Sequence, residues 1–172
     1  CAFRSNTDTE VLLHGYHRWG VDRLVAKLHG MFAFGIWDDT SRKLYLVRDR
    51  LGVKPLVFSV QGGMIAFAST VRALKQAGFL GDLDERAILD YLQVGFICDD
   101  YSIYKGARKL PPASILEWDD GKVTIRRYWS SPPVTLSSLS FEESVESTEE
   151  RLLRAVEMRL HADVPIGILL SG

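Results

Sequence analysis

A short stretch rich in serine and proline divides this chain into two parts of unequal length. Residues 130–139 have the sequence SSPPVTLSSL. Such clusters between regularly patterned segments are typical of linkers rather than of helices or strands. We therefore expect one domain over residues 1–129, a linker over 130–139, and the start of a second domain over 140–172.

The composition is that of a globular protein and disfavours several functional classes. Hydrophobic residues make up 47% of the chain and charged residues 25%, with a formal net charge of −1. No basic excess is available for nucleic-acid binding, and no apolar run is long enough to cross a bilayer. No export signal opens the sequence, so we expect a cytoplasmic protein whose two cysteines are free thiols.

Residues 1–129 have the pattern of a mixed α and β domain. A helix is expected from Asp8 to near Trp19, started by a capping box of Thr7 and Glu10 and ended by Gly20, with a short helix after it. Strands are expected over 31–37, 44–48, 57–60, 64–68, 115–118 and 122–128, and helices near 71–76 and 85–94. Helices before and after a block of antiparallel strands predict sheets covered by helices.

The second part begins with a helix and ends with a buried-strand pattern. Ser140 and Glu143 form a capping box, and apolar residues then follow one helical face. Residues 164–170, with the sequence VPIGILL, have the pattern of a strand from a parallel sheet. Because a central strand has unpaired edges unless neighbours flank it, we expect this second domain to be unfinished at residue 172.

Several segments, taken in order, resemble the asparagine synthetase family of class II glutamine amidotransferases. They are TDTEVLL at 7–13, YHRWG at 16–20, GMFAFGIWD at 30–38, RDRLGVKPL at 48–56, FAS at 67–69, KLPP at 109–112, YW at 128–129, DVPIG at 163–167 and LSG at 170–172. The resemblance covers nearly the whole chain. No single segment is decisive, but their order and the position of the linker together make the signal specific.

The resemblance implies an α+β protein with two different domains. Residues 1–129 would be the C-terminal part of the amidotransferase domain, an incomplete α-β-β-α sandwich of the N-terminal-nucleophile hydrolase type. Residues 140–172 would supply the first helix and strand of a doubly wound α/β synthetase domain.

The resemblance also implies the activity of the whole enzyme. The first domain would hydrolyse glutamine and pass ammonia through a tunnel to the second, which would use ATP and Mg²⁺ to adenylate aspartate. Ammonia would then displace AMP to give asparagine, with pyrophosphate and glutamate as the other products. We expect this fragment to be inactive alone and the whole enzyme to form a homodimer.

Asp8 is the candidate glutamine-binding residue in the first domain. By the resemblance, its carboxylate holds the α-amino group of glutamine, although an aspartate in the first turn also stabilises a helix through the macrodipole. Cys1 is the tempting nucleophile, because an N-terminal cysteine carries its own α-amine as a base. It is rejected, since the family's nucleophile is followed by glycine and lies several tens of residues before the motif at 7–13. We therefore expect no catalytic residue in this fragment.

The chain's last three residues are the candidate ATP-binding residues. Leu170, Ser171 and Gly172 resemble the start of the family's pyrophosphate loop, in which a strand end offers a hydroxyl and backbone N–H groups to phosphates. The remainder of that loop is not in the sequence, so we expect the fragment to bind ATP poorly.

Two other polar groups of residues are interpreted as structural. Glu10, His14 and His17 have helical spacing, but a solvated helix surface explains them better than a metal site, and no metal ligand is assigned. The sequence Arg48-Asp49-Arg50 is expected to shape its loop through ion pairs rather than to contact substrate.

Two departures from the family pattern leave the acceptor open. Thr70 stands where the family commonly has glutamate, and Ala113 stands where it commonly has glycine. A related ATP-dependent amidotransferase with another acceptor therefore stays an alternative. A non-catalytic remnant is a further alternative, because the front and back of the family pattern are missing from the sequence.

Overall fold

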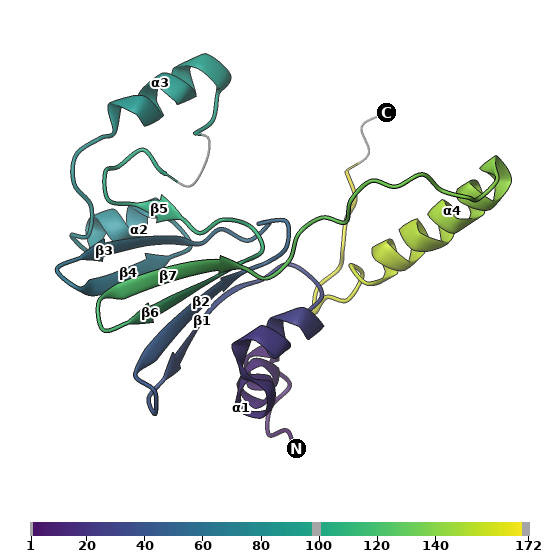
Figure 1. Cartoon of the computed structure of the whole chain (residues 1–172), viewed down its shortest axis with the longest axis horizontal. Coiled ribbons are helices and arrows are strands. Elements are labelled where there is room, and N and C mark those ends of the chain that lie inside the picture. Colours follow the sequence, from purple (N-terminus) through teal and green to yellow (C-terminus); the bar gives the residue numbers. More distant parts are fainter. Residues whose placement is uncertain (1, 98–100, 170–172) are drawn as a thin grey trace. The chain divides into compact units, whose positions relative to one another are not determined.

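The computed structural model describes residues 2–97 and 101–169, which divide into two units (Figure 1). The boundary between the units falls between Ser131 and Pro132.

The first unit opens with a long helix that is interrupted once. Helix α1 (Asp8–Lys27) contains a non-helical residue, Gly20, whose φ of 70° and ψ of 173° break the backbone pattern where the sequence predicts a helix end. Glycine suits this position because it has no Cβ to disfavour positive φ. The predicted capping box is wrong, since Thr7 makes no side-chain cap. Its hydroxyl instead lies 3.0 Å from the Ser5 hydroxyl, and Glu10 reaches back beyond the cap to Arg4 and Ser5.

Four antiparallel strands form the larger sheet, in the order β1-β2-β6-β7. They are β1 (Ala33–Asp38), β2 (Lys43–Arg48), β6 (Ser114–Asp119) and β7 (Lys122–Arg127). Successive side chains of a strand point to opposite faces. Val47 of β2 accordingly packs with Val21 and Val25 of α1, so α1 covers one face of this sheet.

The opposite face of the larger sheet packs on a smaller one. Strands β3 (Val57–Gln61), β4 (Met64–Ala68) and β5 (Arg108–Lys109) are ordered β4-β3-β5. Phe58 of β3, only 2% exposed, joins Leu46 and Leu116 of the larger sheet in one buried cluster.

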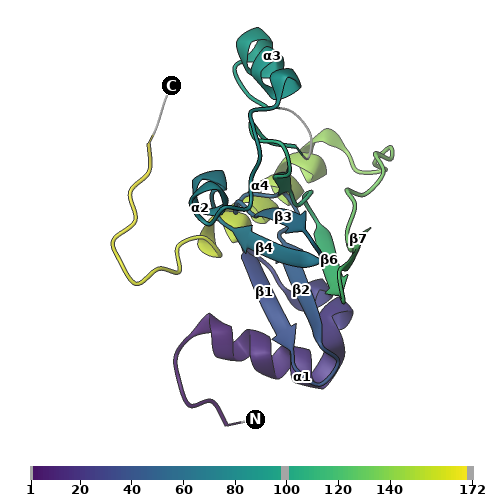
Figure 2. The ribbon, with the colours of Figure 1, turned by 90° about the vertical axis from the view of Figure 1, so that its left-hand side faces the viewer.

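The outer face of the smaller sheet carries another helix. Val57 contacts Leu74 of α2 (Val71–Gln76) in a third cluster. The first unit is therefore layered helix, sheet, sheet, helix, as Figures 1 and 2 show with α1 and α2 on opposite sides. The predicted mixture of helices with antiparallel sheets is confirmed.

One helix of the first unit stands away from these layers. Helix α3 (Glu85–Val94) is capped by Asp84 and ends at Gly95 in the left-handed conformation. Ala87 is its one buried residue, and Figures 1 and 2 both show the helix projecting from the sheets.

The second unit contains helix α4 (Phe141–Glu157), which begins as the sequence predicts. The Ser140 side chain accepts a hydrogen bond from the backbone N–H of Glu143. In return, the Glu143 side chain accepts one from the backbone N–H of Ser140, so this capping box is confirmed. The expected strand at 164–170 is not formed by its described residues, 164–169, which are exposed and in no regular element. A strand is defined by hydrogen bonds to a neighbouring strand, and the described part of this unit contains no other strand that could pair with it.

Candidate functional site

The N-terminus of α1 borders a pocket of about 310 Å³ in the first unit. Its walls come from the start of α1, from the segment leading into β1, from the loop after β2, and from the end of β4. The lining residues are Asp8, Thr9, Leu12, Met31, Phe32, Ala33, Phe34, Lys54, Pro55 and Ser69. The structure therefore places Asp8, the predicted binding residue, at a pocket of a size suited to a small molecule.

The start of α1 is held by the segment that precedes it. The Glu10 carboxylate accepts hydrogen bonds from the backbone N–H of Arg4 at 2.9 Å and from that of Ser5 at 2.7 Å. The hydrogen bond from the Ser5 hydroxyl, followed by that from Arg4, lowers the pKa of Glu10 to about 2. The carboxylate thus stays charged over the physiological range and ties residues 4 and 5 to the turn that begins with Asp8.

Glu10 is consequently occupied as a structural acceptor. Its second neighbour is His14, whose Nε2 lies 3.3 Å away, while the His14 ring meets that of Phe3 edge-on at 5.2 Å between centroids. Among residues 2–97 and 101–169, no group of three or more histidine, cysteine, aspartate or glutamate side chains is arranged to hold a metal ion.

Asp49 organises the loop that forms the opposite wall of the pocket. Its side chain is only 1% exposed and accepts from the backbone N–H of Leu51 at 3.1 Å, Val53 at 3.0 Å and Lys54 at 2.9 Å. Burial acts to raise the pKa of Asp49, but these backbone hydrogen bonds outweigh it, and the pKa is lowered. The loop therefore wraps around a buried carboxylate.

Arg48 secures the same loop from its other side. The guanidinium donates to three backbone carbonyls, those of Lys54 at 2.8 Å, Leu110 at 2.7 Å and Gly52 at 2.6 Å. Burial lowers the pKa of Arg48, while the charge of Asp49 acts in the opposite direction. The sequence predicts ion pairs here. The structure instead shows charge-assisted hydrogen bonds from Arg48 to backbone carbonyls, which hold the loop in its observed shape.

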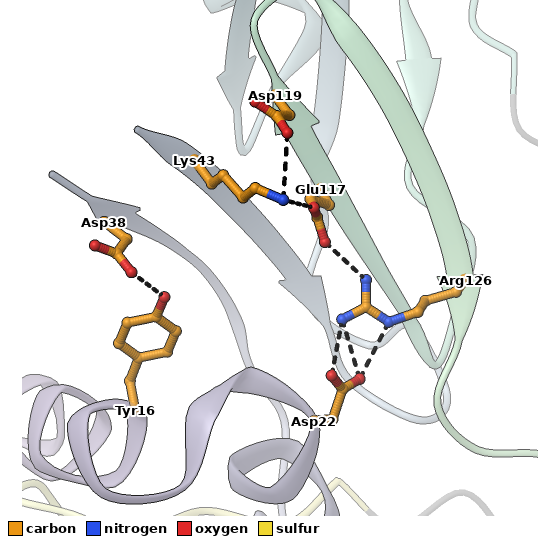
Figure 3. Close-up of polar contacts among 7 residues, drawn as sticks. All are labelled: Tyr16, Asp22, Asp38, Lys43, Glu117, Asp119 and Arg126. Carbon is orange, nitrogen blue, oxygen red and sulfur yellow. Dashed lines mark hydrogen bonds and ion pairs between the residues drawn. The ribbon is translucent and has the colours of Figure 1, made fainter. Parts of the chain in front are cut away.

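Polar contacts to the larger sheet hold the two halves of α1 separately (Figure 3). Before the interruption, the Tyr16 hydroxyl donates to Asp38 at the end of β1, at 2.7 Å. Burial, followed by this hydrogen bond, raises the pKa of Tyr16 above its usual value. After the interruption, Asp22 pairs with Arg126 of β7 at 3.0 Å.

Arg126 belongs to a longer row of charges on that sheet. Its guanidinium also reaches Glu117 at 3.4 Å, and Lys43 contacts Glu117 at 2.6 Å and Asp119 at 3.2 Å. Residue types and spacing did not predict these contacts, because the partners are far apart in the sequence. Together they fix α1, and with it Asp8, against the sheet.

The other predicted site residues lie outside the described part of the chain. Cys1, Leu170, Ser171 and Gly172 are among the residues whose structure is not described. Their roles stay predictions. Among the residues that it describes, no helix is long and apolar enough to cross a membrane.

Comparison with known proteins places the first unit in a family. A family model described as "Glutamine amidotransferase domain" matches residues 1–129. The chain is 33% identical over 172 residues to a Bacillus subtilis protein named asparagine synthetase (glutamine-hydrolyzing) 3, covering 99% of this chain and 28% of the relative. It is 35% identical to a putative asparagine synthetase (glutamine-hydrolyzing) 2 of Methanocaldococcus jannaschii, covering 98% of this chain and 33% of the relative. The chain thus spans about a third or less of the length of these relatives.

The solved structures agree on the fold. A glutamine phosphoribosylpyrophosphate amidotransferase from Bacillus subtilis superposes with a TM-score of 0.55 at 22% identity, covering 76% of this chain and 24% of the other. At that identity the likeness establishes the layered fold of the first unit.

Proposed function

Because the chain belongs to the glutamine amidotransferase domain family, we propose that the full-length protein hydrolyses glutamine at the pocket beside Asp8. The single observation that carries the proposal is the position of Asp8. It lies at the N-terminus of α1, on a pocket within the residues that the family model matches. In this role the Asp8 carboxylate binds the α-ammonium group of glutamine by charge-assisted hydrogen bonds.

The proposed hydrolysis needs a nucleophilic thiol, and residues 2–97 and 101–169 contain no cysteine. Cys1 is followed by Ala2 and Phe3 rather than by glycine. We therefore propose that the attacking thiol is not Cys1 but belongs to another part of the full-length protein. An ordinary role for Cys1 predicts that Cys1→Ala leaves the glutaminase rate of the full-length protein unchanged.

The ammonia is proposed to be used in an ATP-dependent amidation of aspartate. The names of the Bacillus subtilis and Methanocaldococcus jannaschii relatives, which align along nearly the whole chain, support asparagine as the product. In this proposal, Leu170, Ser171 and Gly172 begin the ATP site, and ATP binds with Mg²⁺ in a doubly wound domain that starts near residue 140. Residence in the cytoplasm and assembly as a homodimer stay predictions.

A second candidate is an amidotransferase with a different acceptor. The chain is also 31% identical over 174 residues to a Penicillium rubens protein named amidase chyE, covering 99% of this chain and 25% of the relative. A protein named for a different activity thus aligns over the same length, so the choice of acceptor has to be tested directly.

The test is a product analysis with the full-length protein. Glutamine, aspartate, ATP and Mg²⁺ are supplied together and then with each omitted in turn, and ammonia, glutamate and asparagine are measured. Glutamate and asparagine formed in equal amounts support the proposal. Glutamate formed without asparagine would favour the second candidate, and no glutamate under any condition would contradict both.

A further inference from the structure

A second pocket, of about 530 Å³, lies in the first unit and is lined by strands of both sheets. Its walls come from β3 and β5 of the smaller sheet, from β7 and the turn before it, from residues 101–107 and from the start of α3. We call it the edge pocket, because β5 and β7 are each the last strand of their sheet. Its described lining shares no residue with the pocket beside Asp8.

The shortness of β5 opens the edge pocket. β5 has two residues, which pair with Val57 and Phe58, whereas β3 continues to Gln61 (Figure 1). Just before β5, Gly106 has a φ of 88°, so the chain turns there instead of extending the strand. Among the described residues, no strand pairs with the remainder of β3 on this side. Val60, on the same face of β3 as Phe58, is therefore left 38% exposed at the wall of the pocket.

One part of the lining is apolar. Phe58, which is only 2% exposed, lines the edge pocket together with Val60 and with Val123 of β7. Val123 is partly buried against the same cluster as Phe58, between the two sheets. An apolar group bound here would leave water for contact with the interior of the sandwich, which is favourable.

The other part of the lining is charged, with three basic side chains, Arg86, Lys105 and Arg108, and one acidic one, Asp84. Asp84 caps α3 and accepts from the Arg86 guanidinium at 2.9 Å. Hydrogen bonding from Arg86, with a smaller contribution from the charge of Lys105, lowers the pKa of Asp84. The one acid of the edge pocket is therefore already paired within the protein.

Lys105 is the cation that can meet a ligand. Its backbone is held, since its N–H donates to the Asp82 carbonyl at 2.8 Å and its carbonyl accepts from the Gly81 N–H at 3.2 Å. Its exposed side chain forms no ion pair with any residue that the structure describes. The Arg108 guanidinium lies 5.7 Å from the centre of the Phe58 ring, so positive charge also reaches the apolar part of the lining.

We propose that the edge pocket binds a small organic anion, in which a carboxylate or phosphate group is attached to an apolar ring or chain. The anionic group contacts Lys105, and the apolar body lies against Phe58 and Val60. The volume of the pocket is within the range of small-molecule sites, about 300–1,000 Å³. Neither a bare anion nor an uncharged hydrocarbon uses both parts of the lining, so both are disfavoured. This site is additional to the proposed glutamine site and does not depend on it.

The experiment is a ligand-observed NMR titration of the full-length protein with phenyl phosphate, which combines an anionic group and a ring. We expect saturable binding with a Kd of about 1 mM or tighter, as suits a ligand of this size. Inorganic phosphate and phenol each carry one half of this ligand and should bind at least about tenfold more weakly. Benzoate is titrated in parallel, and whichever aromatic anion binds more tightly identifies the anionic group as phosphate or carboxylate.

Three variants locate the binding. Lys105→Met should weaken phenyl phosphate binding about fivefold, because the lost contact is charge-assisted but exposed to solvent. Val60→Trp fills the apolar part of the lining and should weaken binding at least about tenfold. Lys27→Met is the matched control, because it removes the same charge from an exposed site on α1 outside the edge pocket. That control should leave the Kd within about twofold of wild type.

Failure of this proposal can be told apart from failure of the glutaminase proposal. A wild-type protein that binds neither aromatic anion would overturn the edge-pocket site and leave glutamine hydrolysis untouched. An unchanged Kd in Lys105→Met or in Val60→Trp would do the same, because the anion would then bind elsewhere. Inorganic phosphate that binds as tightly as phenyl phosphate would overturn the role of the apolar lining.

Discussion

The substitution Asp49→Asn should loosen the loop that bears Lys54. Asp49 is buried and accepts three backbone hydrogen bonds, of which that from Lys54 goes to Oδ2 and those from Leu51 and Val53 go to Oδ1. Asparagine can keep its carbonyl oxygen at Oδ1, but its NH₂ group then faces the N–H of Lys54. One bond is lost and two donors are brought together.

The size of the effect follows from the type of bond. A hydrogen bond to a charged acceptor contributes about 1.5–3 kcal/mol, and a buried donor left unsatisfied costs about 1–3 kcal/mol. With partial relaxation of the loop, we expect Asp49→Asn to reduce its local stability by about 2–4 kcal/mol, which accelerates amide exchange at Lys54 roughly 30-fold or more.

The stability that Asp49 gives the wild-type protein depends on pH in a definite direction. Because the pKa of Asp49 is lowered in the folded state, the carboxylate stabilises the fold fully above its unfolded pKa of about 3.9. This stabilisation is lost as pH falls through the folded pKa. Asp49→Asn should abolish this acid-induced loss of stability, because asparagine does not titrate.

Hydrogen exchange with mass spectrometry on peptides covering 50–56 of the full-length protein measures the effect. Asp39→Asn is the matched control, because the Asp39 side chain is 85% exposed. Its described contacts are with Arg42 at 3.3 Å and the Trp37 indole N–H at 3.4 Å, both at the surface. That control should change the local stability by no more than about 0.5 kcal/mol. Equal exchange in wild type and Asp49→Asn would refute the view that this carboxylate holds the loop.

Three further predictions concern the frame around the pocket. Ala113 has a positive φ of 54°, a backbone conformation that a β-branched residue resists. Ala113→Gly should therefore leave thermal stability nearly unchanged, whereas Ala113→Val should lower it by about 2 kcal/mol. Similar melting temperatures for the two variants would contradict this. Tyr16→Phe removes the hydrogen bond to Asp38 and should cost about 1 kcal/mol, seen as faster amide exchange in α1 but unchanged exchange in α2. The lowered pKa of Glu10, about 2, predicts that its hold on Ser5 is complete above about pH 4.5 and is lost as pH falls toward 2. The Ser5 amide chemical shift should follow that titration, and a midpoint near 4.5 would contradict it.

Local sequence signals predicted local structure well. The two hairpins with glycine-containing turns have strands close to their predicted residues, because turn chemistry fixes both strands at once. The break at Gly20 was also predicted from a local signal, because glycine commonly ends a helix. The capping box at Thr7 failed because Ser5, two residues earlier, competes for its hydroxyl, a contact that the motif alone does not contain.

Contacts between distant residues were not predictable from spacing. Asp22 and Arg126 are 104 positions apart, and Arg48 reaches a carbonyl 62 positions away. The division into two sheets likewise depends on which strands pair, and the alternation along each strand does not specify its neighbour. Asp8 was predicted to bind glutamine through the family resemblance, whereas the other residues that line its pocket, Lys54 among them, could be recognised only once the fold was known.

The departure at Ala113 has a structural meaning. The resemblance leads us to expect glycine at this position. Ala113 adopts the left-handed backbone that favours glycine, and its N–H donates to the Asp49 carbonyl at 2.8 Å. The residue is buried at 3% exposure, so its methyl group offsets part of the cost of positive φ. Ala113 thus supports the loop through its backbone and is not among the residues that line the pocket beside Asp8.

The most direct test of the central claim is the KM for glutamine of the full-length protein with Asp8→Asn. If the Asp8 pocket binds glutamine through its α-ammonium group, KM should rise about tenfold or more with little change in melting temperature. Asp8→Glu should show a smaller rise. An unchanged KM in Asp8→Asn, in a protein that still hydrolyses glutamine, would contradict the account and place the glutamine site elsewhere.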